Sequence, residues 1–172
     1  MDYREQVAHR EAAHVVISHI FRGGPIGHGI DIDAPTSVAG AFGNAGVATL
    51  IHDPDLPEEE QKKDLGRNVA IILAGAAADA RTKGCLIGEA LQSQPSDVQI
   101  ARDTIARSPL IPTAGRDPAE VQEEREIVFR VGLQLAEQRL ARPDIWAQVE
   151  TIATACLANG GKLSKQQIEQ LL

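Results

Sequence analysis

The chain has 172 residues, enough for one domain with a sizeable core, and its apolar fraction of 43% and charged fraction of 24% are ordinary for a globular protein. A formal net charge of −7 argues against binding to the phosphate backbone of a nucleic acid. The charged N-terminus has no signal-peptide run, and no apolar stretch approaches the roughly 20 residues that span a bilayer. We therefore expect a single cytoplasmic domain over 1–172, with no nucleic-acid partner and no direct membrane insertion.

The first predicted element is a helix at the N-terminus. Asp2 and Glu5 form a capping-box pattern, and the helix should run to about Phe21, where 23–25 (Gly-Gly-Pro) ends it. The segment from Ile26 to Ile51 alternates apolar and polar residues and is then rich in glycine. This pattern predicts two or three short strands.

A second helix is predicted from near Pro57, capped by Asp55 or Leu56, to Gly84. Its middle, VAIILAGAAADA, is apolar almost all round and indicates a buried central helix. Four further helices are predicted: one capped by Ser96 and ended by Pro109, one over 117–141, one over 144–158, and a short terminal helix with a Ser164–Gln167 capping box. The predicted fold is a mainly α single domain with a small β-sheet after the first helix.

The first candidate site lies on the N-terminal helix, at Arg10-Glu11-Ala12-Ala13-His14. Zinc proteases commonly carry His-Glu-x-x-His on a helix, where two histidines four residues apart hold one metal and the glutamate takes a proton from metal-bound water. Here Glu11 and His14 stand at the places of the base and the second histidine, and Arg10 stands at the place of the first. Taken alone, Glu-x-x-His is common in helices and also fits a surface glutamate and a satisfied histidine.

Four segments together resemble one family. VAHREAAHVV is similar to the VAYHEAGHAVV-like segment of FtsH-type, AAA-linked ATP-dependent zinc metalloproteases. LAGAAADA resembles that family's LGGRAAE-like segment, PSDVQIARDTIA its SNDLxxATxIA-like segment, and KLSKQQIEQLL its terminal segment. The matches follow the family's order from about Val7 to Leu172. The resemblance implies an FtsH-peptidase-like fold, here without the family's AAA ATPase module and membrane anchor.

The resemblance also implies roles for individual residues. His14 and Asp97 match two zinc ligands of a degenerate site, and Glu11 matches the general base. Asp79 matches an acidic residue that could hold a ligand in position. Arg10 matches the missing ligand.

Two of these residues have other interpretations. Asp97 follows Ser96 and could simply favour the helix N-terminus electrostatically. Asp79 could face solvent, or pair with Arg81 or Lys83.

Arg10 determines the expected function. A guanidinium stays protonated and has no lone pair for a metal, so two protein ligands remain where a catalytic zinc has three. We expect Arg10 to pair with Asp97 or Glu11 instead. The expected protein is a pseudoprotease without a cofactor, a regulatory or binding module for a protein or peptide.

The alternative is an active zinc metalloendopeptidase that recruits a substitute ligand, such as His9 or a residue of another chain, with Glu11 as general base. His9 lies five residues from His14, about 140° round an ideal helix, so it could replace the ligand only with a bulge. The sequence leaves open a homo-oligomer and a separate ATPase partner.

Overall fold

The helices and strands follow the predicted order closely. The computed structural model describes residues 1–22, 29–35, 42–45 and 53–172. Within these ranges the elements are α1 (Tyr3–Arg22), β1 (Gly29–Pro35), β2 (Phe42–Ala45), α2 (Glu58–Lys83), α3 (Ile87–Gln92), α4 (Pro95–Ala106), α5 (Pro118–Leu140), α6 (Pro143–Ala158), β3 (Lys162–Ser164) and α7 (Lys165–Glu169). The mainly helical architecture with a small sheet is confirmed.

Helix α1 begins with the predicted capping box. The Asp2 N–H donates to Glu5 Oε2 at 2.7 Å, and the Glu5 N–H donates to Asp2 Oδ1 at 2.8 Å. Two of the N–H groups that a helix start leaves unpaired are thereby satisfied. The helix then runs to Arg22, one residue beyond the predicted end.

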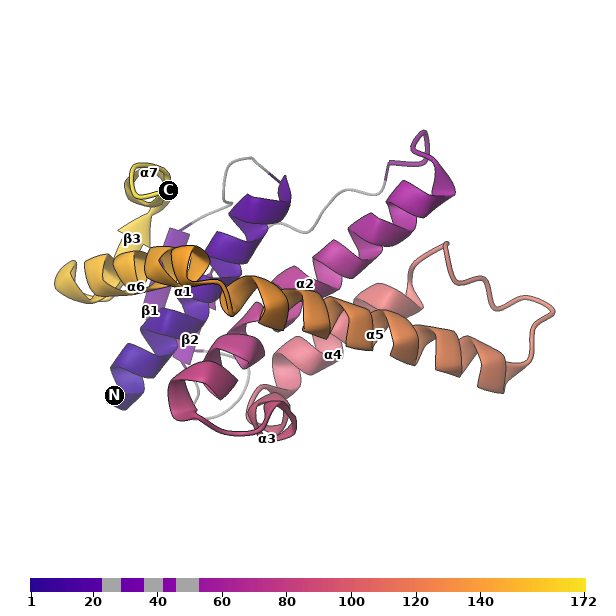
Figure 1. Ribbon diagram of the computed structural model, residues 1–172, viewed down its shortest axis with the longest axis horizontal. Coiled ribbons are helices and arrows are strands. Elements are labelled where there is room, and N and C mark those ends of the chain that lie inside the picture. Colours follow the sequence, from indigo (N-terminus) through magenta and orange to yellow (C-terminus); the bar gives the residue numbers. More distant parts are fainter. Residues whose placement is uncertain (23–28, 36–41, 46–52) are drawn as a thin grey trace.

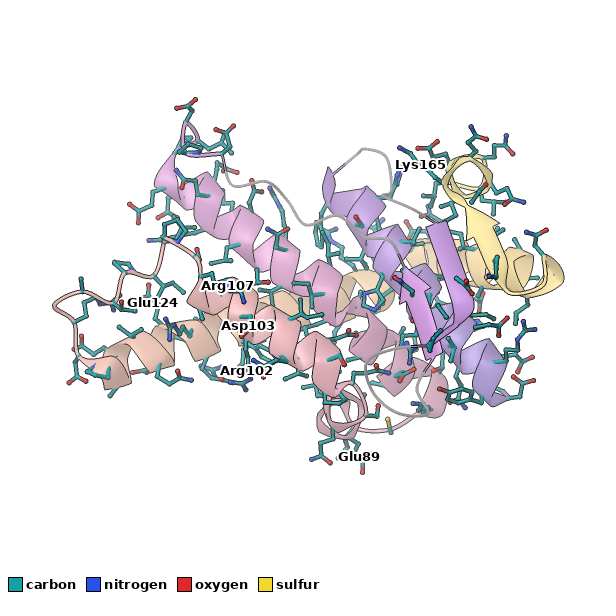
Figure 2. The ribbon with its side chains drawn as sticks, turned by 180° about the vertical axis from the view of Figure 1, so that it is seen from behind. Glu89, Arg102, Asp103, Arg107, Glu124 and Lys165 are labelled. Carbon is teal, nitrogen blue, oxygen red and sulfur yellow. The ribbon has the colours of Figure 1, made fainter. Side chains whose placement is uncertain are left out.

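The sheet is antiparallel, with strand order β2-β1-β3. Ile30 of β1 lies opposite Ala45 of β2 on one side and opposite Leu163 of β3 on the other. Figure 2 shows the sheet beside α1. The two strands β1 and β2 confirm the prediction for 26–51; the other residues of that segment lie outside the described ranges. Strand β3 was not predicted, and it brings the C-terminal part of the chain into the sheet.

Helix α2 is the central helix, as predicted, and its residues 68–79 are all buried. It joins two hydrophobic clusters, one shared with α1, α6 and the sheet, the other with α4 and α5. Figure 1 shows α6 lying across α1 and α5 lying across α2. The helix ends at Gly84, whose φ of 62° is in the left-handed region that glycine adopts readily. Its N-cap is Pro57, not Asp55 or Leu56 as predicted.

Helix α4 begins earlier than predicted. Pro95 is its first residue and Gln94 its N-cap, so the assignment of Ser96 as the cap was wrong. Proline is favoured at the first helical position, because its missing N–H would be unpaired there in any case. Helix α4 ends at Ala106, three residues before Pro109. The short α3 before it was not predicted.

The last helices begin and end close to their predicted limits. The Asp117 side chain accepts a hydrogen bond from the Ala119 N–H at 2.8 Å at the start of α5. At α7 the Ser164–Gln167 capping box forms with both of its hydrogen bonds. Over the residues that the structure describes, no helix combines the length and apolarity needed to cross a membrane.

Candidate functional site

The candidate site is a buried group of charged side chains where α1 faces α2 and the start of α4. Arg10, Glu11 and His14 are only 9%, 4% and 8% exposed. Arg10 and His14 share a face of α1 because four residues make slightly more than one turn. Charged groups at this depth need partners, since burial without compensation costs several kcal/mol. The groups that pair with these three side chains therefore determine the chemistry available to the site.

His14 links three helices. Its Nδ1 lies 2.9 Å from the Ile71 carbonyl oxygen of α2, to which it can donate a hydrogen bond. Its Nε2 lies 3.5 Å from Oδ2 of Asp97, in the first turn of α4. The structure thus brings together the two residues that the sequence resemblance matched to zinc ligands, although they lie on different helices.

The charge state of His14 follows from these contacts. Burial by itself lowers the pKa of the imidazole, but the hydrogen bond and the negative charge of Asp97 oppose this, helped by the charge of Glu11 and by the Ile71 carbonyl. The net result raises the pKa of His14 to about 9. At neutral pH the ring is therefore an imidazolium with N–H donors on both nitrogens.

Arg10 pairs with Glu11, one of the two partners predicted for it. Its Nε lies 2.9 Å from Glu11 Oε1, and the two side chains are only 10% and 6% exposed. The residue that matches a general base therefore accepts a hydrogen bond from a guanidinium. Asp97, the other predicted partner, lies against His14 instead.

Asp79 is buried, at 2% exposure, and it ties α2 to α4. Its Oδ2 accepts hydrogen bonds from Lys83 Nζ at 2.9 Å and from Gln94 Nε2 at 2.8 Å. Lys83 was one of its predicted partners. Gln94 is the N-cap of α4, three residues before Asp97, so Asp79 helps to fix the start of the helix that carries Asp97.

Two glycines complete the site, although neither was assigned to it from the sequence. A Cβ at Gly75 of α2 would lie 2.4 Å from His14 Nε2 and 2.8 Å from Arg10 Cγ, so the bare backbone makes room for both side chains. At Gly43 of β2, where φ is +116°, a Cβ would lie 2.4 Å from Glu11 Oε1. A glycine inside an apolar helix pattern was an available signal for Gly75, since it costs about 1 kcal/mol against alanine and so suggests close packing.

His9 does not lie with the candidate ligands. Its ring stacks on Trp146 of α6 at a centroid distance of 5.9 Å, and its Nδ1 lies 2.8 Å from the Glu5 carbonyl oxygen. His28 and His52 lie outside the described residues.

Among the residues that the structure describes, the side chains around His14 do not complete a catalytic zinc site. His14 and Asp97 supply two donors, whereas such a zinc has three protein ligands, and Arg10, which the sequence resemblance matches to the third, is a cation. In the described part of the chain, no group of three or more histidine, cysteine, aspartate or glutamate side chains could hold a metal. The arrangement instead satisfies its own charges as two ion pairs.

No protein-family model matches this chain, and neither does any curated protein sequence. The likeness to FtsH-type peptidases therefore rests on the four sequence segments and on the proximity of His14 to Asp97.

Proposed function

We propose that this protein is an FtsH-peptidase-like pseudoprotease, a regulatory or binding module for a protein or peptide in which ion pairs have replaced the metal. The observation that carries the proposal is the buried Arg10–Glu11 pair, 2.9 Å long, beside His14 and Asp97. A general base must be within hydrogen-bond reach of the water that it deprotonates and must have an oxygen free for it. One of the two carboxylate oxygens of Glu11, Oε1, already accepts a hydrogen bond from Arg10.

Charge balance supports the same interpretation. A zinc ion would bring two positive charges to Glu11 and Asp97. Arg10 and the imidazolium of His14 bring the same formal charge through hydrogen bonds. Neither cation offers a lone pair or acts as a Lewis acid, so the site can hold helices together but cannot activate a water as a metal does.

The test is a cleavage and binding assay with labelled, unfolded casein. We expect no cleavage by the purified chain at any zinc concentration, and none by Glu11→Gln. We expect fluorescence anisotropy to detect zinc-independent binding of casein peptides.

Zinc-dependent cleavage that a chelator inhibits and Glu11→Gln abolishes would establish the active peptidase instead. Absence of both cleavage and peptide binding would refute the binding role for this class of partner. The Glu11→Gln variant keeps the shape of the side chain and removes its charge and its basicity. Because it also removes the charge partner of Arg10, circular dichroism must show that it is folded under the assay conditions.

A further inference from the structure

A second candidate site lies away from the ion pairs, in a cavity of about 200 Å³ between α4 and α5. Ile105 and Phe129, 2% and 5% exposed, give it an apolar floor. Arg102 and Arg125 lie at its sides together with Asp103 and Glu126. Its volume is below the roughly 300 Å³ at which ordinary ligand pockets begin, so an occupant must be small.

Arg125 is the incompletely paired cation of this cavity. Its Nε is buried and has no hydrogen-bond partner within the described part of the protein. Its Nη2 donates to the Ala106 carbonyl oxygen over a long 3.4 Å. A buried donor that folding leaves unpaired lowers stability, so Arg125 is the lining side chain whose hydrogen-bonding capacity the described part of the protein does not fully use.

The acids around Arg125 already have other partners. Glu126 lies 3.6 Å from Arg102, whose guanidinium also lies over the Phe129 ring at 5.0 Å. Asp103 accepts a hydrogen bond from Gln99 at 2.9 Å and lies 3.9 Å from Arg107.

Glu124, on the same helix as Arg125, pairs with Arg116 at 2.6 Å. Figure 2 shows Arg102, Asp103 and Arg107 on α4 beside α5, with Glu124 near the start of α5. The two arginines of the lining are formally balanced by its two acids, and among the described residues Arg125 is the lining arginine that has no ion-pair partner.

We propose that this cavity binds a small monocarboxylate with an apolar body, the carboxylate on Arg125 and the body against the apolar lining that Ile105 and Phe129 contribute to. The planar guanidinium matches the two oxygens of a carboxylate. The apolar floor favours a hydrocarbon or aromatic body over a bare ion. A phosphate with two charges fits less well, because Asp103 and Glu126 stand at the rim and repel the second charge. This site is separate from Arg10 and His14 and does not depend on the pseudoprotease proposal.

The test is a titration of the ¹⁵N-labelled protein with benzoate, acetate and inorganic phosphate, followed by amide chemical shifts. Benzoate should give saturable shifts centred on 102–106 and 122–129, acetate should bind more weakly, and phosphate should bind more weakly than benzoate. Arg125→Gln should weaken benzoate binding about tenfold to a hundredfold, as expected for loss of a charge-assisted hydrogen bond. The glutamine retains an N–H donor for the Ala106 carbonyl.

Arg130→Gln is the matched control, because it removes the same charge from an exposed position of α5 that does not line the cavity. It should leave benzoate affinity unchanged. The proposal is overturned if the spectra show no saturable shifts at this cavity, if Arg125→Gln binds benzoate as the parent does, or if phosphate binds more tightly than benzoate. The same spectra report whether each variant is folded.

Discussion

Replacing Arg10 by methionine removes the cation from a buried ion pair and leaves the Glu11 carboxylate, 4% exposed, without that compensation. Methionine keeps much of the length of the arginine stem and is a good helix former, so the change acts mainly on charge. We expect the variant to fold and to be markedly less stable.

The size of the effect follows from the separation and burial of the pair. Two unit charges 2.9 Å apart attract by about 6 kcal/mol at an effective dielectric constant of 20. Part of this attraction only offsets the cost of removing both groups from water. Breaking such a pair by deleting one partner typically costs about 3–5 kcal/mol, a large share of the 5–15 kcal/mol by which domains are stable.

Urea unfolding at pH 7 measures the loss. Arg10→Met should lower the free energy of unfolding by about 3–5 kcal/mol, and Arg10→Met combined with Glu11→Met should recover most of it, because no buried charge then lacks its partner. Arg107→Met is the control, since that side chain is 83% exposed and should change stability by less than about 1 kcal/mol. A single Arg10→Met variant as stable as this control, or a double variant less stable than Arg10→Met, would refute the reasoning.

Two further predictions concern the neighbours of this pair. The pKa of His14 is raised from 6.5 to about 9, so its protonated form stabilises the fold fully below about pH 6.5 and this contribution is lost as the pH rises through 9. Unfolding free energy should fall by up to about 3 kcal/mol across that window, and a pH series of urea titrations should show a flatter profile for His14→Gln. Gly75→Ala places a Cβ 2.4 Å from His14 Nε2 and should cost about 1–3 kcal/mol despite the better helix propensity of alanine. At Gly66 of the same helix, the atom nearest to an added Cβ is 3.8 Å away. Gly66→Ala should therefore be neutral or stabilising by up to about 1 kcal/mol when both variants are unfolded with urea.

Local sequence signals predicted the long helices well, because caps and turn residues act over three or four positions. The capping boxes at Asp2 and Ser164 and the glycine end of α2 are of this kind. The three-residue strand β3 has no comparable signal, since what defines it is its pairing with residues 29–31, distant in sequence. The start of α4 was misplaced because Ser96 is a good cap residue, while Pro95 fits the first helical turn equally well.

The candidate site was predictable only in part. The face shared by Arg10 and His14 follows from helical spacing, and the approach of Asp97 was expected only through the family resemblance. A pair between Arg10 and either Asp97 or Glu11 was predicted from the chemistry of these groups, and the pair with Glu11 confirms it. Gly43 was not predictable, because its contribution is space for a side chain of another element, which no local pattern encodes. Gly75 lies in a run of small residues that does indicate close packing, but the run does not say which side chains pack there.

The central claim is that Arg10 stands where a metal ligand would stand, beside His14 and Asp97. The Nε2–Oδ2 distance of 3.5 Å between these two is close to the separation of roughly 3.3–3.5 Å expected for two donors on one tetrahedral zinc. A histidine at position 10 would supply the third donor from the same helix face as His14. The fourth position would then be open for a water near Glu11.

The most direct measurement is a zinc titration at neutral pH of the parent, Arg10→His and Arg10→Gln. Arg10→Gln removes the same positive charge without supplying an imidazole, so it separates the loss of repulsion from the gain of a ligand. We predict weak binding by the parent, a modest gain for Arg10→Gln, and an affinity higher by orders of magnitude for Arg10→His. Equal and weak binding by all three would mean that position 10, His14 and Asp97 do not form a metal site, and it would contradict the proposed relation to the peptidase family.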